Sequence, residues 1–463
     1  MTYVQPQFQS RLRVAFLICI HIVICCTSLI YASRYQFQIA FAPSTFHVFF
    51  DPARWYVAVI VAAAFALAST PFIFADFSFG YFVGFYSYTM ILGYLWLNCF
   101  SDFSYNHGLA GLSAAASAVA FLLPALFISS PVRQIWTLTA RSFDRLLISI
   151  LILGIATIAI GAIYNFQLVV LDDIYKYRQI LATPAIVNYL VTIVSNALLP
   201  FAFAGFVANK APWRAAAVLA LLLLFYPIAL SKVALFTPLW LVAMLVLSKV
   251  FEARISAILS LLVPVLAGLV LISLFGSHAA LYFATVNFRM VTIPSIAMDV
   301  YNDFFSRHDL TYFCQISVLK SIMHCPYQDQ LSIVMQRAYN LGNFNASLFA
   351  TEGIASVGLL FAPIATFAAG LVIAFGNRLS AGLPPGFVLI SGAILPQILL
   401  NVPLSTVLLT HGAALLFLLW YITPRSVFQQ QSKEAPFASN RKGKQTSAPN
   451  DPNPADGHSS VPA

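Results

Sequence analysis

Apolar residues recur along most of the chain in runs of about twenty, the length that a helix needs to cross a bilayer. Short polar segments separate these runs. The pattern therefore predicts an all-α, polytopic integral membrane protein with about twelve transmembrane helices. The expected spans are approximately 15–33, 56–75, 80–100, 109–128, 146–170, 185–208, 215–231, 233–248, 255–276, 348–376, 386–400 and 404–422.

Composition supports the membrane class, because 60% of the 463 residues are hydrophobic and only 8% are charged. Soluble globular chains are about 45–50% apolar and about 25% charged, so a soluble enzyme, a disordered chain and a coiled coil are excluded. No P-loop, GxGxxG after a strand, HExxH or CxxC motif is present, so we expect no cofactor and no metal. No basic run with interleaved aromatic residues suggests nucleic acid as a partner.

The chain divides into a membrane domain, 1–425, and a polar tail, 426–463, which we expect to be disordered and cytoplasmic. A polar segment of 70 residues, 277–346, lies between the ninth and tenth spans. No A-x-A-like cleavage site follows the first apolar run, which we therefore interpret as a span rather than a signal peptide.

Basic residues in short loops set the orientation, because Lys and Arg resist translocation. A cytoplasmic N-terminus places five basic segments, including the tail, on the cytoplasmic side, and both termini are then inside. These segments carry Arg133, Arg141, Arg145, Lys210, Arg214, Lys249, Arg254, Arg378, Arg425, Lys433, Arg441, Lys442 and Lys444. The segment 277–346, the loop 171–184 and the hairpin at Lys232 then face outward, and 277–346 becomes a large periplasmic loop.

Ionisable residues are rare within the expected spans, where His21 and His411 are more typical of packing than of proton transfer. This rarity weakens a transporter hypothesis. The outer segments carry most of the candidate chemistry. Within the large loop, we expect 279–305 to form a helix lying at the membrane interface, because it is mostly apolar and aromatic.

Three cations share the expected outer side: Arg178, Lys232 and Arg289. Arginine matches phosphate oxygens with a planar fork and lysine acts as a point charge, so together they could bind a diphosphate. The alternative is that each cation extends to nearby lipid headgroups from a helix end.

The order of four sequence features resembles the oligosaccharide repeat unit polymerase family, of the O-antigen polymerase type. Together they cover roughly the second half of the chain. They are Tyr175-Lys176-Tyr177-Arg178; Ser231-Lys232; Arg289-x4-Pro294 followed by Tyr301-Asn302-Asp303-Phe304-Phe305; and Gly342-Asn343-Phe344-Asn345-Ala346 leading to Glu352-Gly353 and Gly358.

The resemblance implies a glycosyltransferase with a GT-C-like membrane fold in the bacterial inner membrane. Such enzymes join undecaprenyl-diphosphate-linked repeat units, as donor and acceptor, into O-antigen, capsule or exopolysaccharide on the periplasmic side. Membrane lipids and a chain-length regulator protein would be further partners. Catalysis needs cations for the leaving diphosphate and a base for the acceptor hydroxyl. Candidate bases are His308, Asp303 and Glu352, and expected glycan contacts are Tyr177, Tyr301, Asn343 and Asn345.

Other functions fit the same pattern. An O-antigen ligase also places Arg and His residues in a large outer loop, and a lipid-linked oligosaccharide flippase is the alternative of a different class. The polar residues of the fourth feature, which begins at Gly342, could cap the tenth span or contact the substrate, and the sequence favours neither role.

Cys314 and Cys325 are the two cysteines of the large loop. In an oxidising periplasm they could form a disulfide, although two thiols facing apart and, less readily, a metal site with His324 are alternatives. The other four cysteines, three of them in the first span, are expected to be reduced and apolar in character.

Overall fold

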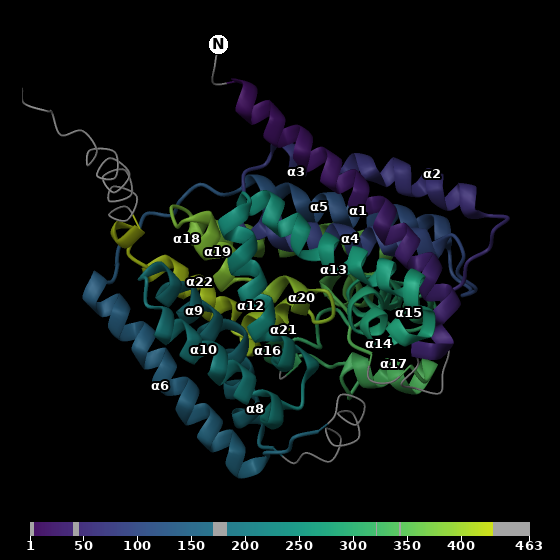
Figure 1. The fold of residues 1–463 in the computed structure, drawn as a ribbon. Coiled ribbons are helices and arrows are strands. Elements are labelled where there is room, and N and C mark those ends of the chain that lie inside the picture. The colour runs from purple at the N-terminus through teal and green to yellow at the C-terminus, as the bar shows by residue number, and fades with distance from the viewer. Residues whose placement is uncertain (1–3, 40–45, 170–182, 321, 342–343, 429–463) are drawn as a thin grey trace, which may run out of the picture.

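A computed structural model describes residues 4–39, 46–169, 183–320, 322–341 and 344–428. These residues fold into helices without a strand, so the all-α class is confirmed (Figure 1). The labels α and η denote α-helices and short 3-10 or π-helical segments. The first half contains α1 Val4–Ile39, α2 Trp55–Ala66, η1 Leu67–Ser69, α3 Thr70–Phe74, α4 Phe79–Asn98, α5 His107–Phe127, α6 Ala140–Tyr164, α8 Ala185–Ile193, η2 Val194–Leu198, α9 Leu199–Ala208, α10 Pro212–Leu224 and α11 Tyr226–Ala229.

The second half contains most of the short and broken helices. It consists of α12 Lys232–Val250, α13 Ala253–Phe275, η3 Gly276–Ala279, α14 Ala280–Phe283, η4 Ala284–Thr292, α15 Ile293–Phe305, α16 Ser317–Lys320, α17 Leu331–Tyr339, η5 Phe349–Ala355, α18 Ser356–Ser380, α19 Pro385–Ser391, α20 Leu395–Leu399, α21 Leu404–Thr410 and α22 Ala413–Ile422.

Nine helical segments of the described residues are long and apolar enough to cross a membrane, and ten if the bent pair α21–α22 is one span. The chain is therefore a multi-pass membrane protein by length and composition of its helices. The two remaining expected spans behave differently. Helix α4 carries four tyrosines and is too polar for this class. The expected span 386–400 is interrupted between α19 and α20.

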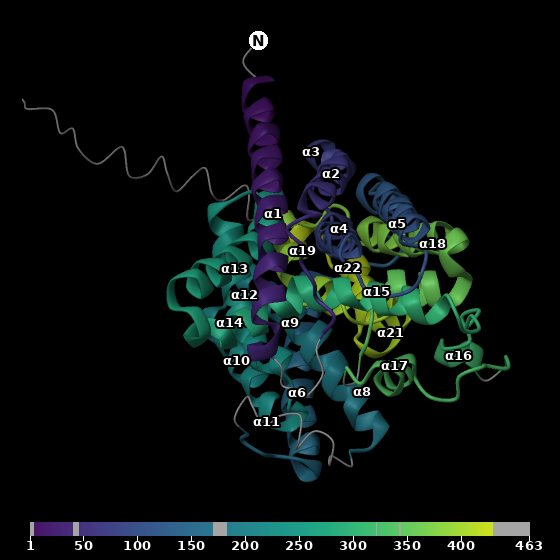
Figure 2. The same ribbon diagram turned by 90° about the vertical axis from the view of Figure 1, so that its right-hand side faces the viewer.

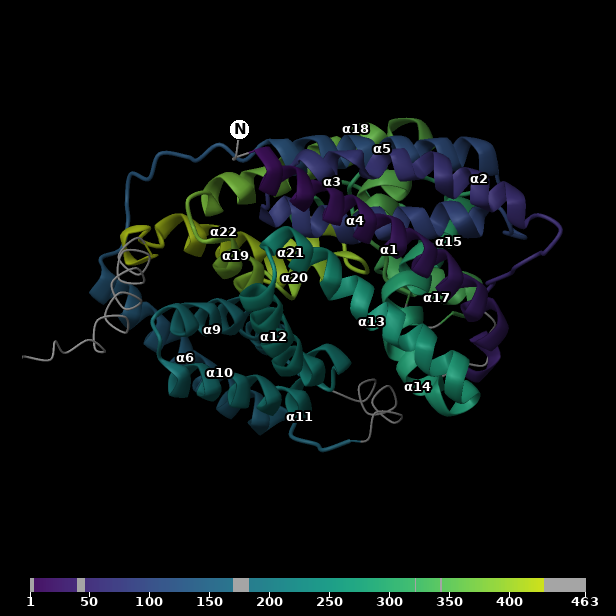
Figure 3. The ribbon, with the colours of Figure 1, turned by 45° about the horizontal axis from the view of Figure 1, so that its top comes forward.

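Helix α4 is buried along nearly its whole length and lies at the centre of one group of helices. It packs against α1, α2, α5, α13 and α15. A second group, α6, α8, α9, α10 and α12, lies beside the first, and α19 touches α9 and α12 (Figures 1 and 3). A buried central helix does not need a lipid-compatible surface, which explains why α4 tolerates its tyrosine hydroxyls.

Polar contacts join the expected cytoplasmic segments to one another. Ser10 Oγ donates to Glu252 Oε1 at 2.9 Å, and the Arg254 guanidinium donates to the Ala75 carbonyl at 3.4 Å. The Arg425 fork joins the C-terminal ends of α18 and α22, donating to the carbonyls of Leu379, Ala381, Trp420, Tyr421 and Thr423. These contacts define an inner end of the bundle.

The expected outer segments meet at the opposite end, where α14, α16 and α17 lie far from the N-terminal end of α1 (Figures 1 and 2). Asn302 Nδ2 of α15 donates to the Tyr94 hydroxyl at 2.9 Å. The Tyr339 hydroxyl of α17 donates to Asp303 at 2.6 Å. The pairing of segments by end thus agrees with the expected alternation of loops.

The expectation of an interfacial helix over 279–305 is wrong for its second half. After Gly276 the chain turns back, and Asn287 Nδ2 reaches the Val265 carbonyl in the interior of α13 at 2.8 Å. All thirteen residues of α15 are buried in protein. The physical reason is that α15 is apolar on one side and carries polar partners for α4 and α17 on the other.

Candidate functional site

The polar residues of α15 form the centre of the candidate site. Asp299, Asn302 and Asp303 are each at most 3% exposed, and all three lie in the second half of α15. Buried carboxylates are costly without hydrogen-bond donors, so their partners identify the groups that the fold holds in place. We call these three residues and their side-chain partners the α15 cluster.

One half of the α15 cluster comes from α4 and the loop that follows it. The Tyr105 hydroxyl donates to Asp299 Oδ1, lies 2.9 Å from Asn98 Oδ1, and lies 3.3 Å from the Tyr94 hydroxyl. Burial and the neighbouring Tyr94 and Asp299 raise the pKa of the Tyr105 hydroxyl. It therefore stays protonated as a donor.

His107 completes this half of the cluster. Its Nδ1 lies 2.8 Å from Asn98 Oδ1, and its Nε2 lies 2.9 Å from the Phe103 carbonyl. Asn98 Nδ2 donates to the His107 carbonyl at 3.0 Å, which fixes the amide with its oxygen toward the ring. Both facing oxygens accept, so a ring nitrogen of His107 that carries a proton finds an acceptor on either side.

The other half of the cluster surrounds Asp303. Arg307 forms an ion pair with Asp303 Oδ2, and the Tyr339 hydroxyl donates to the same oxygen. Burial and the Asp303 carboxylate raise the pKa of Tyr339, so this donor keeps its proton well into the alkaline range. Asp303 thus joins the end of α15 to α17 and is held as a buried acceptor.

His308 differs from the other candidate bases because it is exposed just beyond the end of α15. Its Nδ1 lies 2.8 Å from the Phe304 carbonyl, and its ring stacks on Phe304 with centroids 4.0 Å apart. A carbonyl can only accept, so Nδ1 donates and the neutral ring carries its basic lone pair on Nε2. The fold therefore fixes the tautomer and the ring plane of a solvent-facing base.

Glu352 lies in η5 and is bound to the start of α21. Its Oε1 accepts hydrogen bonds from Ser405 N at 3.0 Å and Ser405 Oγ at 2.8 Å, and its Oε2 accepts one from Thr351 at 2.7 Å. The carboxylate therefore caps α21 rather than its own helix. Tyr301, which is 1% exposed, lies within electrostatic range of Glu352 and is too buried to meet a glycan at the surface.

The predicted cations lie on separate elements. Lys232 is the first residue of α12 and is half-buried, whereas Arg289 is exposed in η4. The helical run from α14 to α15 places Arg289 roughly 24 Å along the helix from Phe305, at about 1.5 Å per residue. Arg289 therefore lies near the middle of this helical run, whereas His308 lies just beyond its C-terminal end.

The remaining predicted contacts are only partly described. Asn345 is exposed in the segment that leads into η5. Tyr177, Arg178 and Asn343 lie outside the described residues. Sequence reasoning missed Tyr94, Asn98, Tyr105 and His107; the nearest signal was the cluster of polar and aromatic residues at 98–107, between two expected spans.

A disulfide joins Cys314 to Cys325, with a Cα–Cα distance of 5.4 Å, so the bridge alternative is confirmed. Just before the bridged segment, backbone hydrogen bonds run from Thr311 N to the Ala355 carbonyl and from Tyr312 N to the Ser356 carbonyl, and they join the chain there to η5 and α18. Within the described residues no group of His, Cys, Asp and Glu side chains could hold a metal ion.

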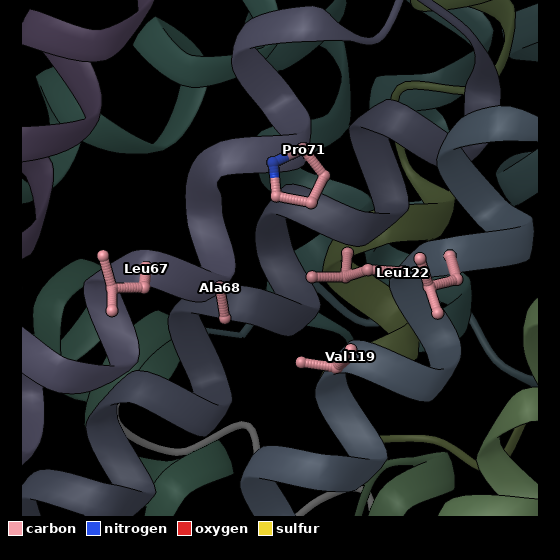
Figure 4. A pocket seen from close by; sticks show the side chains of 6 residues that line it. Leu67, Ala68, Pro71, Val119 and Leu122 are labelled. Carbon is pink, nitrogen blue, oxygen red and sulfur yellow. The ribbon is translucent and has the colours of Figure 1, made fainter.

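Two surface cavities lie away from the α15 cluster. The one in Figure 4, of about 320 Å³, is lined by apolar residues of the η1–α3 bend and of α5. The other, of about 370 Å³, lies at the turn between α13 and α14 beside His278 and Tyr282. The lining residues of these two cavities include neither His308 nor a residue of the α15 cluster.

Comparisons with protein-family models, with curated proteins and with solved structures found no match to this chain.

Proposed function

We propose that this chain is a membrane glycosyltransferase that polymerises undecaprenyl-diphosphate-linked repeat units on the outer side of the bacterial inner membrane, with both termini cytoplasmic. The observation that carries the proposal is His308, an exposed imidazole whose Nδ1 is bound to the Phe304 carbonyl, whereas the two candidate carboxylates, Asp303 and Glu352, accept hydrogen bonds from protein donors. A general base of this kind is what an acceptor hydroxyl requires.

The neighbouring groups fit this reaction. The Arg307 side chain is 56% exposed although it pairs with Asp303, and it directly precedes His308 in the sequence. It can stabilise negative charge on the departing diphosphate of the donor. Sequence analysis did not select Arg307; its role follows from its position one residue before the base.

Arg289 then receives a different role. A polymerase holds two lipid-linked substrates, and in the acceptor the attacking hydroxyl is separated from the diphosphate by the length of a repeat unit. A cation far from the base along one helical rod suits the acceptor diphosphate. Lys232 and Arg178 remain candidates for the same headgroup chemistry.

The disulfide supports the orientation. Bridges persist in oxidising compartments such as the periplasm, and Cys314–Cys325 lies at the end of the bundle that carries His308. The contacts of Arg254 and Arg425 lie within segments that the excess of basic residues assigns to the cytoplasmic side.

A flippase remains the second candidate, and one observation favours it. The span formed by α21 and α22 bends by 62°, and discontinuous helices line the substrate sites of many transporters. A deletion strain separates the functions through its surface glycans and its lipid-linked intermediates. We expect single repeat units on the surface without a ladder. Accumulated lipid-linked polymer would identify a ligase instead, and lipid-linked single units retained on the cytoplasmic side would identify a flippase.

A further inference from the structure

A non-helical strap, residues 128–139, links α5 to α6 and is fixed to the ends of two other helices. Arg378 Nε, in the last turn of α18, donates to the Ser130 carbonyl at 3.1 Å. Leu138 N donates to the Ile422 carbonyl at 3.0 Å, where the strap passes the end of α22 (Figure 3). The strap therefore follows a fixed path across the ends of α18 and α22.

The strap holds two large apolar side chains outside the protein. Ile135 is 91% exposed and Trp136 is 63% exposed. The backbone beneath them is fixed, since Ile135 N donates to the Tyr421 hydroxyl at 2.9 Å. Exposed apolar side chains on a fixed backbone indicate a surface that a partner covers. Non-helical backbone does not enter the hydrocarbon of a bilayer, so these side chains can reach no deeper than the headgroup layer, where tryptophan is enriched.

A second segment of the same character is joined to the start of α6. Residues 209–214, between α9 and the first turn of α10, carry the exposed side chains of Lys210, Trp213 and Arg214, and Trp213 is 87% exposed. Arg214 Nη1 donates to Asp144 Oδ1 of α6 at 3.0 Å, which connects this segment to the helix that follows the strap. We call the strap, the first two turns of α6 and residues 209–214 the basic patch.

The charge of the basic patch selects the kind of partner. Its basic residues outnumber its acidic ones by five to one: Arg133, Arg141, Arg145, Lys210 and Arg214 against Asp144. Arg141 and Arg145 are exposed and share a face of α6, because they are four residues apart. Within the part of the chain that the structure describes, the Asp144 carboxylate already pairs with Arg214. The excess of cations beside exposed tryptophans therefore fits an anionic surface that also accepts apolar side chains.

We propose that the basic patch inserts Ile135, Trp136 and Trp213 into the headgroup layer of the bilayer and binds anionic phospholipid there. The strap leads directly into α6, and residues 209–214 lead into α10. Both helices belong to segments long and apolar enough to cross a membrane, so a bilayer surface adjoins the patch. Guanidinium groups bind phosphate oxygens, and tryptophan rings occupy the boundary between headgroups and hydrocarbon. This binding does not depend on glycosyltransferase activity.

Quenching of tryptophan fluorescence by brominated lipids tests the proposal on the full chain in phosphatidylcholine bilayers. Brominated phosphatidylglycerol and brominated phosphatidylcholine are titrated separately, and the signal of one ring is the difference between the wild type and its Trp→Phe variant. Trp55 is the matched control, because it is 53% exposed at the start of α2 and the neighbouring Arg54 is paired with Asp51.

We expect phosphatidylglycerol to quench Trp136 at least about fivefold more effectively than phosphatidylcholine, the factor that one basic residue near an anionic surface contributes. Trp213, measured through Trp213→Phe, should behave like Trp136. The two lipids should quench Trp55 about equally.

Charge variants separate lipid binding from folding. Arg141→Gln combined with Arg145→Gln should remove most of the preference at Trp136 without lowering the melting temperature, because both side chains are exposed. Arg141→Lys combined with Arg145→Lys should retain the preference, because the charge is kept. Equal quenching of Trp136 by the two lipids, or the same anionic preference at Trp55, would overturn the proposal. Failure of both lipids to quench Trp136 would also overturn it and would leave a soluble acidic partner as the occupant of the basic patch.

Discussion

Tyr105→Phe should destabilise the protein, because the Tyr105 hydroxyl is the donor to a carboxylate that is 3% exposed. The ring stays the same size, so packing against His107 is preserved while the hydrogen bonds to Asp299 and Asn98 are lost. A buried acceptor left unsatisfied costs about 1–3 kcal/mol. We expect a loss of about 2 kcal/mol, which for a chain of this length lowers the melting temperature by about 2 °C.

The assay is thermal unfolding of the purified protein in detergent, followed by tryptophan fluorescence. Tyr312→Phe is the matched control, since Tyr312 is 63% exposed on the outer loop. In an Asp299→Leu background the acceptor is already gone, and Tyr105→Phe should cost less by about 1 kcal/mol. A melting temperature for Tyr105→Phe equal to that of Tyr312→Phe, or full additivity with Asp299→Leu, would refute the α15 cluster as a stabilising network.

Three further outcomes follow from named contacts. Alkylation of the denatured protein should modify four cysteines without reductant and all six after reduction, and equal labelling would remove the Cys314–Cys325 bridge. Tyr339→Phe should lower the free energy of unfolding by an amount that is constant below about pH 10 and decreases only at higher pH. The reason is that a tyrosine whose pKa is raised in the folded state stabilises the fold fully below its unfolded pKa. A difference from the wild type that vanishes by pH 8 in thermal unfolding contradicts this. Burial lowers the pKa of Arg425 to about 10. Arg425→Lys should lower the melting temperature in the same assay, because lysine lacks the planar fork that joins the ends of α18 and α22. An unchanged melting temperature contradicts the role of Arg425 in joining these ends.

The sequence predicted the multi-pass membrane class, because that class depends on runs of residue types rather than on contacts. It overestimated the number of regular spans at two places. Helix α4, with its four tyrosines, is buried inside the bundle and needs no lipid-compatible surface. The interruption between α19 and α20 depends on packing that composition does not reveal. Burial of α15 was missed for a similar reason: its apolar character fits an interface and a protein interior equally well.

For the site, residue type selected His308, Asp303 and Glu352, but only contacts could rank them. Asp303 and Glu352 are acceptors for Tyr339 and Ser405, whereas the Phe304 carbonyl leaves Nε2 of His308 as the basic atom. The separation of Arg289 from His308 could not be judged from the sequence, because it depends on the continuous helical run from α14 to α15.

Polymer formation by the purified protein tests the central claim most directly. The wild-type chain and His308→Gln, in matched proteoliposomes, receive the lipid-linked repeat unit, and product length is measured by gel electrophoresis. Loss of a general base costs about 10²–10⁴-fold in rate, so we predict a ladder from the wild type and single units from His308→Gln at equal melting temperature. A full ladder from His308→Gln would contradict the account.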